Sequence, residues 1–369
     1  MWLFYLLIIY ILVLGAFLGF SNKSDLKKNM YIYFTFGLFL ILSAFRGENV
    51  GNDTINYLNL FKEISVSDNL SLFSPRFEVG YVYLNKVLSY FSSNPQIILI
   101  VTSIIIMLGF ARFISKYSKI PWLSVYLFFT LGYYGMSLNT IRLNIAIVLV
   151  LLSYDFLKNK KAFRFIFVII LASLFHRTAI FFLIAWPLIK MKITLKTIAI
   201  FCLVSIGMYF SFPSLLSMSL SLFPTYGYYV GSDYLNGEVR LASVMNMLVG
   251  ISIALLGILI NHQKHINEKK EISFKTKERD NEDNHNMLIL LFTGISLIFI
   301  SFRFNLLDRI GDYFIVFAIV YLPNVMVQLK DSKLRYTLIY FIILLFFAYV
   351  ATIQMLRPEW NEIYPYSFF

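Results

Sequence analysis

Charged residues are scarce in this chain of 369 residues: Asp, Glu, Lys and Arg make up only 14%. A typical soluble domain has about 25%. Apolar residues account for 59% of the chain and aromatic residues for 18%, and the mean hydropathy is +0.73. This composition argues against a cytosolic enzyme or a nucleic-acid binder and places the chain in a membrane.

Cysteine is nearly absent as well. The single residue, Cys202, lies in an apolar run and cannot form an intramolecular disulfide, so the fold depends on neither cysteine pairs nor a Cys-rich metal site. The sequence contains no Walker loop, Rossmann glycine signature, HExxH or GxSxG motif. Nothing therefore indicates ATP hydrolysis, redox chemistry or a metallopeptidase, and we expect no metal and no cofactor.

Long apolar runs are plentiful. A membrane span needs about 20 apolar residues, because each adds 1.5 Å of helix across roughly 30 Å of hydrocarbon. The runs predict an all-α integral membrane protein with about 12 transmembrane or re-entrant helices in a single polytopic domain over residues 1–369, several of them short. The first run, Met1 to Phe20, has no basic n-region and no small-residue cleavage site, so we expect a retained span.

The Lys and Arg residues alternate between loops. Six loops carry three, three, four, three, six and three of them, 22 of the 32 in the chain. The positive-inside rule makes these loops cytoplasmic and both termini external, so the net charge of +12 is interpreted as topology. The six loops are Ser21 to Asn29, Arg112 to Ile120, Lys158 to Arg164, Lys190 to Lys196, His262 to Asn286 and Lys330 to Arg335.

Two loops are longer than the others. Residues 46–94 form the longest external stretch, and within it Glu78 to Phe91 places Val79, Val82, Tyr83, Val87 and Phe91 near one helical face, as expected of an interfacial helix. Residues 262–286 carry six cations and six acids and are predicted to form a mobile cytoplasmic loop.

A short hairpin is predicted around His176 and Arg177. Both flanking basic loops should be cytoplasmic, so residues 163–189 must leave and return within 27 residues, although two full spans need about 40. Either the hairpin is thin or its tip stays below the outer surface, where these two side chains would line an outward-opening cavity.

Arginines gather at the predicted external ends of spans, on the side that the positive-inside rule disfavours. Arginine matches phosphate oxygens with planar N–H donors and keeps its charge when partly buried. An anion site is therefore the favoured interpretation, and snorkelling to lipid headgroups is the alternative for any single arginine. Arg142 is the strongest candidate, with polar contact between helices as its alternative role. The set is Arg46, Arg142, Arg177, Arg303 and Arg309.

His176 is the one histidine outside the charged cytoplasmic stretch. A neutral imidazole, with an unperturbed pKa near 6.5, can accept a proton from a sugar hydroxyl at physiological pH. A structural role, capping or bridging at a helix turn, is the alternative.

Two further segments combine charge with turn-forming residues. In Arg46 to Tyr57, Gly47 and Gly51 permit tight turns, and Asn52 or Asp53 can cap a helix over about 54–63. Capping is the favoured role of Asp53, and Glu48 is freer. In Asp308 to Tyr313, Arg309 can pair with Asp312, either as charge compensation at a span end or in substrate binding.

These segments together resemble the EpsG-like family of Wzy-type exopolysaccharide and O-antigen polymerases. The resemblance is carried in order along nearly the whole chain, and it departs from the family where Leu143 replaces a frequent Gln. The motifs are RGENVGNDTINY at 46–57, LNTIRLNIA at 138–146, ASLFHRTA at 172–179, FRFNLLDRIGDYF at 302–314 and the terminal YPYSFF.

The resemblance implies a multi-pass glycosyltransferase of the bacterial cytoplasmic membrane. Such an enzyme extends a polysaccharide at the outer face of the membrane from undecaprenyl-pyrophosphate-linked oligosaccharide. A flippase and a chain-length regulator are the expected pathway partners, and no nucleic acid is expected to bind. The resemblance points to Arg46, Gly51, Asp53, Thr54, Tyr57, Arg142, His176, Arg309 and Tyr313. Together with the chemistry of the residues described above, it makes His176 and Arg142 the expected catalytic residues. The expected substrate-binding residues are Arg46, Glu48, Asp53, Tyr57, Arg177, Arg303, Arg309, Asp312 and Tyr313.

Other functions fit parts of the same pattern. A flippase or transporter for lipid-linked oligosaccharide would hold pyrophosphate with the same arginines, but should show polar or broken helices through both leaflets. A glycan ligase or a sugar acyltransferase is a third possibility. The polar groups of the predicted spans cluster on the external side, which favours catalysis at that side over transport. Aromatic external residues are candidates for stacking on sugar rings, namely Tyr81, Tyr83, Tyr90, Tyr226, Tyr228 and Tyr229.

Overall fold

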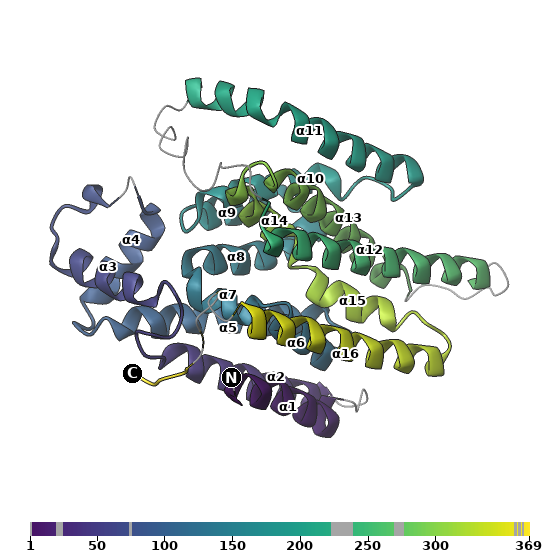
Figure 1. Cartoon of the computed structure of the whole chain (residues 1–369), viewed down its shortest axis with the longest axis horizontal. Coiled ribbons are helices and arrows are strands. Elements are labelled where there is room, and N and C mark those ends of the chain that lie inside the picture. Colours follow the sequence, from purple (N-terminus) through teal and green to yellow (C-terminus); the bar gives the residue numbers. More distant parts are fainter. Residues whose placement is uncertain are drawn as a thin grey trace. The chain divides into compact units, whose positions relative to one another are not determined.

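The computed structural model is helical over nearly all of the chain that it describes (Figure 1). Those residues are 2–19, 25–73, 76–222, 239–268, 277–357, 360, 363 and 365–369. They contain no strand, only an isolated antiparallel bridge between Arg46 and Phe368. Within them, six helices are long and apolar enough to cross a membrane. This supports a multi-pass membrane protein, and the expected count of about 12 spans stays a prediction.

The chain divides into two compact units. Unit 1 comprises Met1–Phe156, Phe163–Ile180 and Leu329–Phe369, and unit 2 comprises Leu157–Ala162 and Phe181–Gln328. The single polytopic domain over residues 1–369 also stays a prediction, since the chain passes repeatedly between the two units.

Unit 1 is built from antiparallel and parallel helices joined by short turns. Its helices are α1 (Trp2–Leu14), α2 (Asp25–Ala44), α3 (Thr54–Val66), α4 (Val79–Ser89), α5 (Gln96–Tyr117), α6 (Pro121–Thr130), α7 (Tyr133–Asn139), α8 (Ile141–Lys158), α9 (Ala162–Ser173) and α16 (Ser332–Leu356), with a π-helical turn η1 (Gly15–Gly19) and a 3-10 turn η2 (Leu70–Leu72). The last two residues of α8 and the first of α9 belong to unit 2.

Aromatic side chains fill the core where α2, α5, α6 and α7 meet. Phe39 lies 4.7 Å from Tyr134 and 5.8 Å from Phe129, measured between ring centroids. Phe128 contacts Phe110 at 4.6 Å. These rings are buried, and such pairs add to the energy of burial itself. This core packs against α7, and α8, which carries Arg142, begins two residues after α7 ends.

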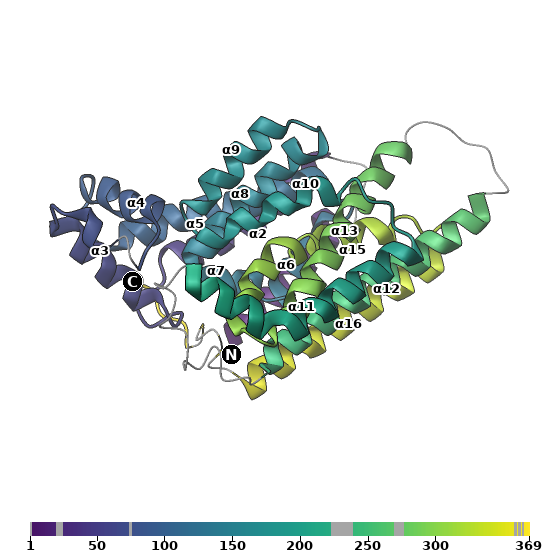
Figure 2. The same ribbon diagram turned by 90° about the horizontal axis from the view of Figure 1, so that it is seen from above.

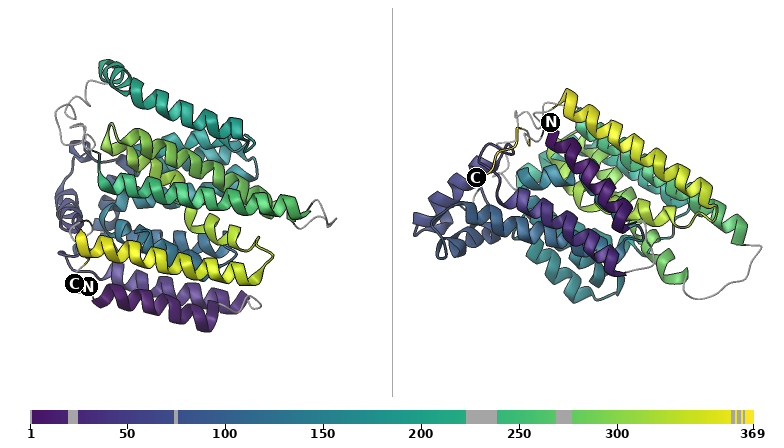
Figure 3. Two further views of the ribbon diagram at one scale, coloured as in Figure 1. Left: turned by 45° about the vertical axis from the view of Figure 1, so that its right-hand side comes forward. Right: turned by 90° about the horizontal axis from the view of Figure 1, so that it is seen from below.

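α3 and α4 lie together at one end of unit 1, next to the start of α5 and the loop that follows α2 (Figure 2). The Gln96 side chain joins this end together, because its amide donates to the carbonyl oxygens of Ala44 at 2.8 Å and Arg46 at 3.1 Å. Both chain termini lie at this same end (Figure 3). The arrangement agrees with the predicted external position of residues 46–94 and of the termini, and the orientation in a membrane remains a prediction.

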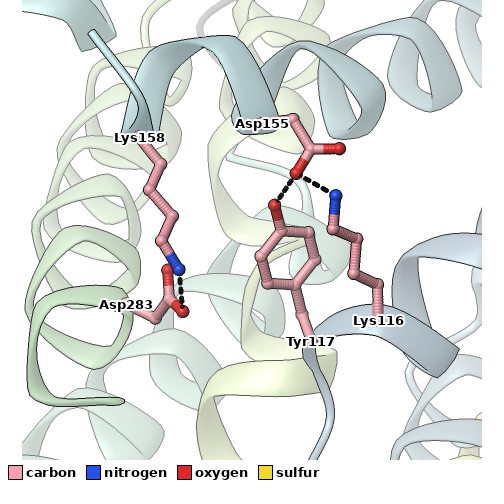
Figure 4. A network of polar contacts seen from close by, with 5 residues as sticks. All are labelled: Lys116, Tyr117, Asp155, Lys158 and Asp283. Atoms are coloured by element: carbon pink, nitrogen blue, oxygen red, sulfur yellow. Dashed lines mark hydrogen bonds and ion pairs between the residues drawn. The ribbon is translucent and has the colours of Figure 1, made fainter. Parts of the chain in front are cut away.

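The opposite end of unit 1 carries basic residues of the predicted cytoplasmic set. Lys116 of α5 forms an ion pair with Asp155 of α8 at 2.5 Å, and Tyr117 donates to the same carboxylate (Figure 4). Cationic groups thus mark the end of unit 1 that lies away from α3 and α4, as the loop charges predict.

Unit 2 packs around α13. Its elements are η3 (Arg177–Ile184), which begins in unit 1, α10 (Ala185–Leu188), α11 (Leu195–Leu222), α12 (Leu241–Glu268), α13 (Lys277–Ser301), the 3-10 turn η5 (Asn305–Leu307), α14 (Asp308–Ile315) and α15 (Ala318–Met326). Lys158 pairs with Asp283 of α13 at 2.5 Å. α11 contacts α13 through rings such as Tyr209 and Phe299, 5.1 Å apart, and otherwise leaves its apolar surface exposed, as a lipid-facing helix would.

Residues 262–286 and the hairpin around His176 are the two remaining segments whose structure was predicted from the sequence. In residues 262–286 the predicted loop is helical where it is described, because α12 continues to Glu268 and α13 begins at Lys277; residues 269–276 lie outside the described part. The hairpin around His176 has short arms as expected. α9 has 12 residues, which at 1.5 Å each gives about 18 Å, well below the roughly 30 Å of hydrocarbon.

Candidate functional site

Arg142 occupies the first turn of α8. α7 ends at Asn139 and α8 begins at Ile141, so Arg142 directly follows the break between these two helices. A cation is unfavourable at a helix N-terminus, where the helix dipole favours negative charge. Glu78 supplies that charge: its Oε2 pairs with Nη1 of Arg142, and the two side chains are only 11% and 22% exposed.

Glu78 also contacts the turn after α9, which contains His176. Its Oε1 accepts the backbone N–H of Arg177 at 3.4 Å. Two residues later the N–H of Gly80 donates to the carbonyl of Leu174 at 2.9 Å. A Cβ at position 80 would lie 2.7 Å from that carbonyl oxygen, so glycine is required for the close approach. The start of α4 thus joins the start of α8 to the turn after α9.

His176 is oriented by its neighbours within this turn. The side chain is 8% exposed, and Nδ1 lies 2.7 Å from the Thr178 hydroxyl. The main chain is fixed on both sides, since the His176 N–H donates to Ala172 and its carbonyl accepts from Ala179. In the tautomer whose Nδ1–H donates to Thr178, the lone pair for proton transfer is on Nε2. The Arg177 side chain is exposed at the same turn.

Aromatic groups complete the surroundings of Arg142. The Phe77 ring lies 5.1 Å from the guanidinium carbon, a cation–π distance. The buried Tyr57 of α3 is on another side, and burial raises the pKa of its hydroxyl while the nearby Arg142 opposes that rise. Nε of Arg142 is buried and has no hydrogen-bond partner among the described residues. The guanidinium therefore retains a donor that its protein partners do not use.

Arg46 has a different role from the one expected. Its side chain is 1% exposed, and its three nitrogens donate to the Thr54 hydroxyl at 3.2 Å and to the carbonyl oxygens of Ser43 at 2.6 Å and Leu138 at 3.0 Å. Burial lowers the pKa of Arg46 to about 10, so it stays charged at neutral pH. This geometry makes Arg46 a buried connector between α2, α3 and α7, and we leave it out of the ligand set.

The rest of the RGENVGNDT motif builds the same connector. Gly51 adopts a φ of +93°, which L side chains rarely adopt. Asp53 stands at the N-cap of α3 as predicted, but its carboxylate accepts from the Asn56 side chain at 3.4 Å and makes no cap hydrogen bond to the backbone. Glu48 is exposed. The C-terminal segment covers the motif from outside, since Gly47 donates to the Ser367 carbonyl at 2.8 Å.

The other predicted residues lie in unit 2. Arg309 of α14 interacts electrostatically with both Asp308 and Asp312, and Tyr313 is fully buried. Arg303 packs on the Tyr209 ring, with 4.3 Å from its guanidinium carbon to the ring centroid. Asp308, Arg309 and Asp312 thus form a second group of charges in α14.

In unit 1 the Glu78 carboxylate pairs with Arg142, which interacts with Tyr57, and accepts the backbone N–H of Arg177, the residue after His176. The structure adds two residues that the sequence interpretation missed as site residues, Glu78 and Thr178. The weak signals for them were the H-x-T spacing and an acid at the start of a predicted helix. Among the stacking candidates, Tyr83 and Tyr90 are exposed, whereas Tyr81 is fully buried, so that expectation was wrong for Tyr81. Tyr226, Tyr228 and Tyr229 lie outside the described residues.

The donor set at this site suits an anion. It contains guanidinium groups, hydroxyls, one imidazole and the Glu78 carboxylate that pairs with Arg142. Within the described part of the chain no group of three His, Cys, Asp or Glu residues could hold a metal ion. The fold and site thus define a polytopic helical membrane protein with a basic site beside a histidine at one end. The EpsG family profile matches residues 29–368, and the chain belongs to this family of Wzy-like polymerases. No curated protein and no solved structure matches the chain.

Proposed function

We propose that the chain is a polysaccharide polymerase of the glycosyltransferase type. It transfers a growing glycan from undecaprenyl pyrophosphate to a lipid-linked repeat unit at the outer face of the bacterial cytoplasmic membrane. A flippase of the same pathway supplies the repeat units to that face, and a chain-length regulator is the second partner. Membership in a family of Wzy-like polymerases supports the reaction class.

The observation that carries the proposal is that one carboxylate, that of Glu78, pairs with the Arg142 guanidinium and accepts the backbone N–H of Arg177, the residue after His176. A pyrophosphate leaving group needs cations close to its oxygens, and guanidinium groups supply them without a metal. The N-terminus of α8 adds a positive dipole end at the same place. The imidazole of His176, oriented by Thr178, supplies the base.

The chemical step follows from these positions. The acceptor hydroxyl forms a new bond to the anomeric carbon of the donor sugar, and the bond from that carbon to the pyrophosphate oxygen breaks. His176 takes the hydroxyl proton, and the bonding electrons leave with undecaprenyl pyrophosphate, whose charge Arg142 and Arg177 balance. Thr178 keeps the imidazole in the orientation that the transfer requires.

Purified protein in detergent, incubated with lipid-linked repeat units, tests the proposal. A polymerase lengthens the units without a sealed membrane, and we expect a ladder of products from the wild type and none from His176→Ala or Arg142→Ala at equal folded concentration. A flippase produces no ladder in detergent. A ligase or an acyltransferase gives transfer to a different carrier or a new acyl group, which mass analysis of the products detects. Any of these last three results would overturn the assignment.

A further inference from the structure

The ion pair between Glu78 and Arg142 occupies the guanidinium that the proposed reaction needs. The carboxylate contacts Arg142 through Oε2 and the Arg177 N–H through Oε1. Both of its oxygens therefore lie where the oxygens of a bound phosphate would meet Arg142 and the turn of His176. Two anions cannot share this place at low dielectric without strong repulsion.

We propose that Glu78 is an exchangeable counter-ion for Arg142. In the substrate-free enzyme its carboxylate holds the guanidinium in position, and the lipid diphosphate displaces it on binding. After transfer the carboxylate returns to Arg142 and speeds release of the diphosphate product. This inference rests on the proposed function, since it assumes that Arg142 binds the diphosphate, and it makes Glu78 a positioning residue.

The surroundings of the pair support exchange over a permanent structural bond. Arg142 keeps a second partner, the Phe77 ring at 5.1 Å, and has an Nε without a hydrogen-bond partner among the described residues. The guanidinium can thus keep its place on the ring while its carboxylate partner changes. The partial burial of both side chains makes an unpaired guanidinium unfavourable, so it should bind the next available anion strongly.

The effect of Glu78→Gln on the affinity for a diphosphate distinguishes an exchangeable counter-ion from a permanent structural partner of Arg142. Glu78→Gln removes the competing charge with little change of shape. If Glu78 is exchanged, the variant binds farnesyl diphosphate in detergent about five- to tenfold more tightly than the wild type. If Glu78 only holds Arg142 in place, the variant binds with equal or lower affinity, which would overturn the inference. Glu63→Gln on the exposed face of α3 removes the same charge elsewhere, and we expect affinity within twofold of the wild type.

Turnover gives a second readout. With lipid-linked repeat units, Glu78→Gln should lower both KM and kcat, because the diphosphate product leaves slowly. In the background of Arg142→Gln, adding Glu78→Gln should not tighten binding, since the gain acts through the guanidinium. If Glu78→Gln does not fold, Glu78→Asp serves instead, and its shorter carboxylate should give a two- to threefold gain; no gain there also counts against exchange.

Failure of the inference and failure of the proposed function look different. Farnesyl diphosphate that binds the wild type but not Arg142→Ala, together with no gain from Glu78→Gln, rejects only the exchange. A folded wild type that does not bind farnesyl diphosphate at all rejects the diphosphate site itself, and the exchange with it.

Discussion

The imidazole of His176 depends on one hydroxyl for its orientation. Thr178→Val removes the hydrogen bond to Nδ1 while keeping the shape of the side chain. A neutral hydrogen bond contributes about 1 kcal/mol, so we expect kcat for chain extension to fall roughly five- to tenfold, with KM for the lipid-linked unit little changed. Thr178→Ser restores the hydroxyl and should retain most of the rate. Equal rates for the valine and wild-type enzymes would contradict this role.

Arg46 shows that an arginine in a family motif can serve the fold. Arg46→Ala leaves the Ser43 and Leu138 carbonyls without their donor, and we expect the free energy of unfolding to fall by about 3 kcal/mol. Thermal unfolding in detergent measures the loss. Arg46→Lys should also be less stable, because one ammonium group cannot reproduce the planar fork.

Ligand binding separates Arg46 from Arg142. Folded Arg46→Ala should bind farnesyl diphosphate within twofold of the wild type, whereas Arg142→Ala should lose binding. A thermally stable Arg46→Ala that fails to bind the diphosphate would return Arg46 to the ligand set.

At the scale of elements, α4 has two faces with different surroundings. Tyr81, Val82, Asn85 and Leu88 are buried, whereas Val79, Tyr83 and Val87 of the helix, and Phe91 just beyond its end, are exposed at a spacing of four residues. Such a stripe on an external helix fits the predicted place at the membrane interface. The sequence placed Val82 on the exposed face, and the structure buries it.

The stripe predicts contact with lipid. In a Cys202→Ser background, a fluorophore on Tyr83→Cys should be quenched by brominated lipids in a nanodisc. The same fluorophore on Glu63→Cys, at an exposed polar position of α3, should be quenched much less. Equal quenching at the two positions would place α4 in water.

Helices were the part of the fold that the sequence could predict. Apolar runs fix where a span begins and ends, because every backbone group in hydrocarbon must be paired within the helix. The break at Thr140 was not predicted, because residues 138–157 are mostly apolar and form one continuous run in the sequence. At this break the Leu138 carbonyl accepts a hydrogen bond from Arg46, a contact between distant parts of the chain.

At the scale of the whole molecule, the site was harder to predict than the spans. The charge pattern singled out Arg142 and Arg177 together with Arg46, Arg303 and Arg309, because arginine on the disfavoured side of a membrane is unusual. His176 was singled out as the one histidine outside the charged cytoplasmic stretch. Glu78 was not predicted as a site residue, because its contact with Arg142 joins residues 64 positions apart in the chain. Arg46 was misplaced for the same reason: its partner at Leu138 is 92 positions away.

Charge distribution also predicts the orientation of the chain in the membrane. In the Cys202→Ser background, Glu48→Cys should react with an impermeant maleimide on intact spheroplasts, and Lys119→Cys only after permeabilisation. Both side chains are exposed, so access depends on sidedness. The reverse pattern would invert the topology and place His176 on the cytoplasmic side.

The central claim is that Arg142 and Arg177 hold a lipid diphosphate beside His176. A cryo-EM structure of the protein with undecaprenyl diphosphate, enlarged by a bound antibody fragment, tests it most directly. We predict diphosphate density in contact with the guanidinium of Arg142 at the start of α8 and next to the His176 turn, with Glu78 moved away from Arg142. Diphosphate density bound elsewhere, with the Glu78–Arg142 pair intact, would contradict the account.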